Sequence, residues 1–209
     1  MTTHGFDKDY WERHWRDRGA GSMGGHPPNP YLAREIGGLT PGTALDAGCG
    51  GGAEAIWLAS HGWEVTAADI SSEVLALAAD RATMSTAASG AAERVRWVEA
   101  DLSVWSPDTR LDLVMTHYAH PAMPQLEFYD RIAGWVAPGG TLLIVGHLHV
   151  AGSGHGHHPP EEASVTSAAV AARLDDSEWE IVTAEEHVRT RSGHGGPLHD
   201  VVVRATRRR

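Results

Sequence analysis

The sequence predicts an α/β fold: a doubly wound, seven-stranded sheet that is mostly parallel and carries helices on both faces. From about residue 43 onward, apolar runs alternate with helix-like segments, as in folds built from βαβ units. The central runs are rich in valine and isoleucine, which is typical of strands buried on both faces. The last two runs are joined only by a glycine-rich segment, too short for a helix, which predicts an antiparallel β-hairpin at one edge.

The seven predicted strands span residues 43–47, 63–69, 94–100, 111–117, 140–147, 179–187 and 199–206. The helices predicted between them span residues 53–60, 73–86, 126–136 and 163–174. Crossovers between the parallel strands are expected to be right-handed.

The segment before the first strand predicts a helix over residues 7–18. Asp7 is placed to cap it, and Trp11 and Trp15 lie four residues apart on one face. A Gly/Pro-rich loop follows at residues 19–30. We find no internal repeat and no linker. We therefore expect a single domain over 1–209, with an N-terminal helical lid segment at 1–42 and a ligand-binding core at 43–209.

Composition narrows the possible partners. The net charge of −10 disfavours nucleic-acid binding, which needs a basic surface. No apolar run reaches the roughly 18–20 residues of a membrane-spanning helix, and the N-terminus lacks the apolar core of a signal peptide, so a cytoplasmic location is expected. Cys49 is the only cysteine, which excludes a disulfide framework. The expected partner is a small molecule, and the sequence defines no oligomeric state.

A glycine-rich turn, ALDAGCGGGAEA, separates the first strand from a helix. Such turns hold phosphates, dinucleotides or S-adenosylmethionine (SAM) at a helix N-terminus. A Walker-type phosphate loop requires a lysine, and the only lysine is the distant Lys8. Gly48, Gly50 and Ala53 formally satisfy the dinucleotide pattern. Asp46, two positions before the first glycine, favours SAM, because a carboxylate can reach its methionyl end but is less suited to a pyrophosphate.

Four segments, LDAGCGGG, VTAADIS, VEADLSVW and APGGTLLIV, occur in an order and at a spacing that resemble the class I SAM-dependent methyltransferases. The resemblance covers residues 44–147 and implies a Rossmann-like fold. It implies that Asp69 binds the ribose hydroxyls and that Ile70 packs on the adenine. Asp101 would accept from the adenine amine, and Leu102 would supply a backbone contact. The cofactor-binding residues that it implies in the turn are Asp46, Gly48, Gly50 and Gly52.

The N-terminal segment YWERHWRDRG, followed by a loop and NPYL, is similar to the small thiopurine and tellurite-resistance methyltransferases. In that family this helix packs over the SAM site, so Trp11 and Trp15 become cofactor-binding candidates. The family acts on small, often soft nucleophiles. The tetrapeptide [DN]PP[YF] is absent after the fourth strand, which disfavours methylation of DNA amines or protein glutamine.

Histidines gather where the fourth and fifth strands end, in THYAHP and GHLH. Because histidine titrates near neutral pH, His117 is the first candidate for a general base, with His147 and Tyr118 as further catalytic candidates. A metal site formed by His147, His149, His155, His157 and His158 is possible. It is not expected, because this histidine-rich loop lacks the spacing of a known zinc motif.

The sequence thus predicts an enzyme that moves a methyl group from SAM to a small acceptor, leaving S-adenosylhomocysteine (SAH). The acceptor would be a thiol, a chalcogen oxyanion or a phenol-like hydroxyl. Two alternatives stay open at this point: an NAD-dependent oxidoreductase, and a non-catalytic SAM-binding or metal-sensing protein.

Overall fold

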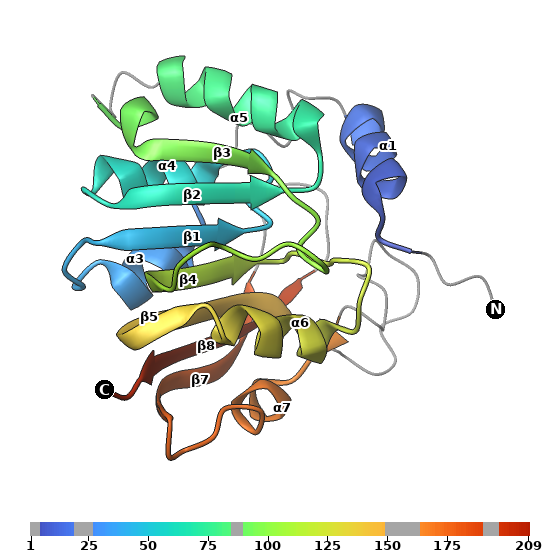
Figure 1. Cartoon of the computed structure of the whole chain (residues 1–209). Coiled ribbons are helices and arrows are strands. Elements are labelled where there is room, and N and C mark those ends of the chain that lie inside the picture. Colours follow the sequence, from blue (N-terminus) through green and yellow to red (C-terminus); the bar gives the residue numbers. More distant parts are fainter. Residues whose placement is uncertain (1–4, 19–26, 85–89, 149–163, 190–196) are drawn as a thin grey trace.

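The computed structural model of the chain describes residues 5–18, 27–84, 90–148, 164–189 and 197–209. Its centre is a mixed sheet with the strand order β3-β2-β1-β4-β5-β8-β7, and β6 pairs with β5 off this path. The strands are β1 (Thr43–Ala47), β2 (Glu64–Asp69), β3 (Val95–Glu99), β4 (Leu111–His117), β5 (Val136–Leu148), β6 (Ser164–Val165), β7 (Trp179–Arg189) and β8 (Leu198–Arg207). Figure 1 shows these strands lying side by side, one below another, with helices in front of and behind the sheet.

The described helices are α1 (Lys8–Arg18), α3 (Pro30–Ile36), α4 (Ala53–Ser60), α5 (Ser72–Met84), α6 (Gln125–Ala133) and α7 (Ser167–Ala171), with a 3₁₀ turn, η1, at Ala92–Arg94. The cap predicted for α1 is present, because the backbone N–H of Tyr10 donates to Oδ1 of Asp7 at 2.8 Å. Helix α3 was not expected. Its start has a local cause: Asn29 accepts from the N–H of Tyr31, and Pro30 occupies the first turn.

The pairing confirms the predicted topology. Strands β1 to β5 pair in parallel, and β8 runs antiparallel to both β5 and β7. The strand count differs, because the sheet has eight strands and not seven. The extra strand, β6, lies where the helix 163–174 was predicted, and α7 begins only after Thr166, whose hydroxyl accepts from the N–H of Ala169. Two residues are too few to show the alternation that identifies a strand in a sequence.

The end of the helix predicted over residues 126–136 is also wrong. Helix α6 ends at Ala133, and Val136 already pairs with Leu111 at the beginning of β5. A continuous apolar run can belong to either type of element, so this boundary could not be read from the pattern.

Two apolar layers hold the helices against the sheet. On one face, Leu32 of α3 and Leu58 of α4 pack with β1, β2 and β4 in a buried cluster. On the other face, Phe128 and Ile132 of α6 pack with β4, β5 and β8. The sheet is therefore covered on both faces, as the valine-rich and isoleucine-rich strands predicted.

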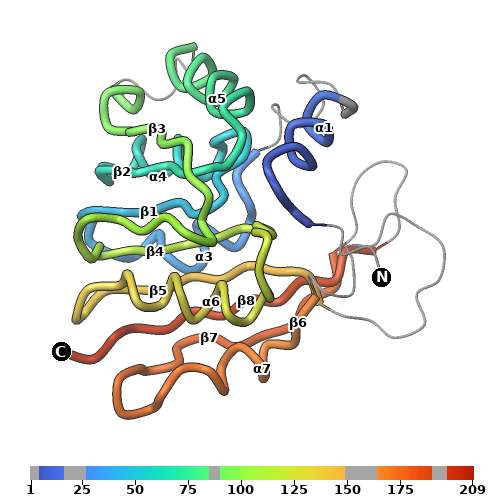
Figure 2. Tube along the Cα trace, turned by 45° about the vertical axis from the view of Figure 1, so that its right-hand side comes forward, coloured from blue at the N-terminus to red at the C-terminus, as the bar shows by residue number. Residues whose placement is uncertain are grey.

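All five N-terminal strands point their carboxyl ends toward one edge of the sheet. Helix α1 stands beside this edge, next to the ends of β1 to β3, in both Figure 1 and the turned view of Figure 2. The sheet topology thus brings the ends of strands distant in sequence together under one helix. No helix in the described ranges is long and apolar enough to cross a membrane.

Leu142 tests the importance of this core, because it is fully buried in the middle of β5. We expect Leu142→Ala to lower the free energy of unfolding by about 2–5 kcal/mol, through lost burial and the cavity that is left. Urea denaturation measures this. The matched control is Val182→Ala on the exposed strand β7, where a change within about 0.5 kcal/mol is expected. Equal losses in the two variants would contradict the assignment of the core.

Candidate active site

A cavity of about 700 Å³ opens at the carboxyl edge of the sheet. Open α/β sheets bind ligands at this edge, and the volume suits a small-molecule site. We divide its lining into two parts. The β1–β3 half comprises Asp46, Gly48, Gly50, Glu54, Asp69, Ile70, Arg81, Asp101 and Leu102. The β4–β8 half comprises His117, Tyr118, His120, His147, Arg189 and Leu198.

The glycine turn closes tightly against its neighbours. Gly48 has a φ of 83°, and a Cβ atom on it would lie 2.3 Å from the Cβ of Ala119. The N–H groups of Gly48 and Cys49 both donate to the carbonyl of Ala68 in β2, at 2.8 and 3.0 Å. Only glycine meets these demands at position 48. The turn consequently brings bare backbone to the cavity wall.

Gly52 does not belong to the cavity lining, in contrast to the other predicted glycines. It precedes α4 with a φ of 74°, and a Cβ on it would lie 2.6 Å from the ring of Trp97. Its place in the motif therefore reflects helix entry and packing.

Asp46 is buried at the end of β1, and its Oδ2 has no hydrogen-bond partner among the described residues. Burial, together with the nearby carboxylates of Glu54 and Asp69, raises the pKa of Asp46 well above its usual range. A positively charged ligand group would stabilise a buried carboxylate oxygen that lies close to other carboxylates. The ammonium of the methionyl end of SAM is such a group, so the residues fit this cofactor.

The other residues predicted to bind the cofactor follow β2 and β3. Asp69 accepts from the N–H of Gly50 at 2.9 Å and from Ser71 at 3.0 Å, and burial raises its pKa. Ile70 and Leu102 line the cavity beside it. Asp101 also lines the cavity, and its Oδ1 accepts from the N–H and hydroxyl of Ser103. The structure brings these side chains together at one end of the cavity.

Aromatic side chains of the N-terminal segment cover both halves. Trp15 lies over the glycine turn, since a Cβ on Gly50 would be 3.2 Å from its ring. Trp11 stacks near His120, with 6.4 Å between ring centroids, and its Nε1 donates to the carbonyl of His120 at 3.2 Å. The two tryptophans that the sequence placed on one helix face therefore both line the cavity.

Tyr118 is the only described non-glycine residue with a positive φ, at 57°. Its hydroxyl donates to Oδ1 of Asp200 at 2.8 Å and accepts from Nη2 of Arg189 at 2.9 Å. Its ring packs on His147, with 4.5 Å between centroids. Burial and the Asp200 carboxylate raise the pKa of Tyr118. The phenol is thus held in place and kept protonated.

The histidines of this region are kept neutral. Burial, with a further contribution from His120, lowers the pKa of His147 to about 4. Burial also lowers the pKa of His120, whose Nδ1 lies 3.0 Å from Oε1 of Gln125. His117 lines the cavity as predicted, with a pKa lowered by burial, and neither ring nitrogen has a hydrogen-bond partner among the described residues. Both nitrogens are buried.

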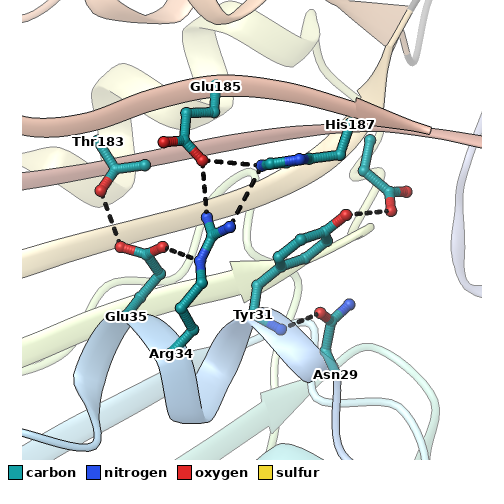
Figure 3. A network of polar contacts seen from close by, with 8 residues as sticks. Asn29, Tyr31, Arg34, Glu35, Thr183, Glu185 and His187 are labelled. Carbon is teal, nitrogen blue, oxygen red and sulfur yellow. Dashed lines mark hydrogen bonds and ion pairs between the residues drawn. The ribbon is translucent and has the colours of Figure 1, made fainter. Parts of the chain in front are cut away.

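A buried polar network behind Tyr118 was missed by the sequence analysis. Asp200 is fully buried and accepts from the hydroxyls of Tyr118 and Tyr31, and it forms an ion pair with Arg189. Figure 3 shows the ring of Tyr31 below His187 of β7, with Asn29 accepting from the N–H of Tyr31 at the start of α3. The one available signal was the acidic residue in the apolar run HDVVVRAT.

The expectation that the protein has no metal site stays a prediction. Within the described ranges, no group of three or more His, Cys, Asp or Glu side chains is arranged to hold a metal ion. His149, His155, His157 and His158 lie outside the described residues.

Comparison with known proteins gives the class. Residues 44–140 match the family described as a methyltransferase domain. Over 162 residues the chain is 29% identical to the probable thiol methyltransferase 2 of Arabidopsis thaliana, covering 75% of this chain and 68% of that one. It is 40% identical over 112 residues to the ribosomal RNA small subunit methyltransferase C of Alcanivorax borkumensis, covering 50% of this chain but only 32% of the relative.

A solved structure supports the same class at the level of the fold. The magnesium protoporphyrin IX methyltransferase of Synechocystis, solved with bound SAH, superposes with a TM-score of 0.67 at 20% identity, covering 97% of this chain and 96% of that one. Residues 44–140 thus form a methyltransferase domain, and the chain has the fold of that solved methyltransferase. The oxidoreductase alternative is accordingly not favoured.

Asp46→Asn should have opposite effects on stability and on binding. The amide oxygen can still accept the N–H of Ala55, while the buried charge is removed. We therefore expect a higher Tm for the ligand-free variant at pH 8. This gain should shrink as the pH falls, because a raised pKa means that the wild-type carboxyl becomes protonated first. SAM should bind roughly 10- to 100-fold more weakly, since a charge-assisted hydrogen bond is lost.

Thermal melting with and without SAM, at several pH values, measures both effects. Asp108→Asn in an exposed loop serves as the control and should change neither quantity. Unaltered SAM affinity in Asp46→Asn would remove Asp46 from the cofactor site.

Proposed function

We propose that the protein transfers the methyl group of SAM to the sulfur of a small-molecule thiol. One observation carries the choice of acceptor: the histidine and tyrosine side chains of the β4–β8 half are buried, and burial favours their neutral forms near pH 7. The similarity to a probable thiol methyltransferase supports the same class of acceptor.

A general base works best when its pKa lies near the working pH. His147, with a pKa lowered to about 4, binds a proton weakly, and Tyr118 stays protonated. The acceptor must then lose its own proton at little cost. At pH 7, ionising a thiol with a pKa near 8.5 costs about 2 kcal/mol, whereas a phenol with a pKa near 10 costs about 4 kcal/mol. This difference favours a thiol over a hydroxyl.

We further propose specific roles for the rest of the cavity. Asp46 holds the ammonium of the cofactor, Asp69 its ribose hydroxyls, and Asp101 its adenine amine. Residues 1–42 act as a lid on a single catalytic domain, with Trp11 and Trp15 excluding water. When bound, SAM supplies a methyl group on a sulfonium sulfur, and the chain supplies position and desolvation.

A screen with labelled SAM tests the acceptor. Matched aliphatic and aromatic thiols, phenols and amines, together with selenite and tellurite, are offered at fixed pH. We expect labelled thioethers, formed at rates that increase with the thiolate fraction. Methylation of amines or phenols in preference to thiols would overturn the proposed acceptor. Stabilisation of the protein by NAD, with none by SAM or SAH, would overturn the methyltransferase reading itself.

His147→Gln tests whether this imidazole acts as a base. We expect kcat/KM for a thiol to fall by less than about tenfold and the pH profile to keep its shape, because general bases contribute about 10²–10⁴. His187→Gln is the matched control, since His187 lies outside the cavity lining. A hundredfold loss, with a changed acidic limb of the profile, would identify His147 as the base.

A further inference from the structure

We propose that Arg189 makes the β4–β8 half of the cavity select acceptors that bind and react as anions. Anion binding stands on the geometry of this half alone, while the reacting step rests on the proposed function.

The orientation of a buried ion pair is the main observation. Arg189 pairs with Asp200, and the two differ in access to the cavity. The side chain of Arg189 is 28% exposed and lines the cavity, whereas that of Asp200 is 0% exposed and does not line it. The positive end of the pair therefore faces a ligand, and the negative end lies behind it.

Hydrogen bonds fix the negative end in that position. Oδ1 of Asp200 accepts from the hydroxyl of Tyr118 at 2.8 Å, and Oδ2 accepts from Tyr31 at 3.0 Å. Figure 3 shows Tyr31 reaching from α3 toward the strand that carries His187. Tyr118 directly follows β4, and Tyr31 lies in α3. Both carboxylate oxygens therefore have hydrogen-bond donors without contact with the cavity.

The guanidinium of Arg189 is fixed as well. Its Nε donates to Asp200, and its Nη2 donates to the hydroxyl of Tyr118 at 2.9 Å. It also lies over the ring of Tyr31, with 5.6 Å between Cζ and the ring centroid. A charge held in this way needs little reorganisation when an anion arrives, which strengthens its effect.

No other described group in the β4–β8 half opposes an anion. Burial keeps the imidazoles of His117, His120 and His147 neutral near pH 7. Tyr118 and Tyr31 are protonated phenols, because burial is the main cause that raises the pKa of each. Asn29, which donates to the hydroxyl of Tyr118 at 3.4 Å, carries no charge.

The carboxylates that line the cavity all belong to the other half. They are Asp46, Glu54, Asp69 and Asp101. Arg81, the basic residue of that half, donates to the carbonyl of Gly51 at 2.6 Å beside the glycine turn. The cavity is thus divided into an acidic part and a part whose described formal charge is that of Arg189.

This division matches the charge balance of thiol methylation. The thiol first loses its proton to water, and Arg189 stabilises the resulting thiolate. The thiolate sulfur then forms a bond to the methyl carbon, while the carbon–sulfonium bond breaks and its electron pair stays on the sulfur of SAH. An opposite charge within about 4–6 Å shifts a pKa by roughly one to three units, so Arg189 should increase the thiolate fraction of the bound acceptor.

A chromogenic acid measures the effect of Arg189 on the pKa of a bound ligand without catalysis. The probe is 4-nitrophenol, whose anion is yellow and which titrates near neutral pH. It is titrated spectroscopically with the protein saturated with SAH, so that no methyl donor is present. We expect bound probe to titrate about one unit or more below free probe. Absence of binding, or binding with an unshifted pKa, would overturn the proposal.

The double variant Arg189→Met, Asp200→Asn provides the matched comparison. It removes both charges together, which avoids leaving Asp200 buried without a counter-charge. We expect it to bind SAH like wild type and to lose the shift of the probe. Arg173→Met, which removes an exposed pair with Asp130, is the control and should keep the shift. A shift retained in the double variant would also overturn the role of Arg189.

The probe and the thiol screen separate the two proposals. A shifted probe with no thiol methylated would refute thiol methylation and leave anion selection standing. Methylated thiols with an unshifted probe would refute anion selection alone.

Discussion

The structure depends on the central position of β1, which pairs in parallel with β2 on one side and with β4 on the other. The chain builds outward through β2 and β3, then returns to the opposite side of β1. Loops that leave β1 and β4 therefore diverge, and the cavity opens between them. The tight turn at Gly48 and the left-handed backbone of Tyr118 sit on the two sides of this division. Each residue shapes one wall of the cavity with a positive φ that a regular strand does not have.

The two walls differ in electrostatic character because different elements build them. The carboxylates of one wall lie at or just beyond the carboxyl ends of β1, β2 and β3, and in the first turn of α4. The other wall uses the C-terminal hairpin, where Asp200 of β8 is neutralised by Arg189 of β7. The antiparallel strands thus contribute more than an edge to the sheet. They add a fixed positive charge to a cavity in a chain whose net charge is −10.

The sequence predicted the part of the site that local motifs encode. Asp46, Gly48 and Asp69 lie at strand ends that periodicity identifies, and the parallel topology then brings them together. Gly52 satisfied the same motif for a packing reason. The network around Asp200 could not be predicted, since its partner Tyr31 lies 169 positions away. The histidines were assigned roles from their ordinary proton affinity, and burial changes that affinity in a way that no motif records.

Polar contacts hold helix α3 against β7. Arg34 lies between Glu35 and Glu185 of β7, and Glu35 also accepts from Thr183 (Figure 3). These contacts join positions that lie about 150 residues apart in the sequence. All residues of the β1–β3 half have been synthesised once the chain reaches residue 102. The β4–β8 half also requires Arg189 and its partner Asp200. During synthesis from the N-terminus, the residues proposed to hold the methyl donor are therefore made well before Arg189, which is proposed to face the acceptor.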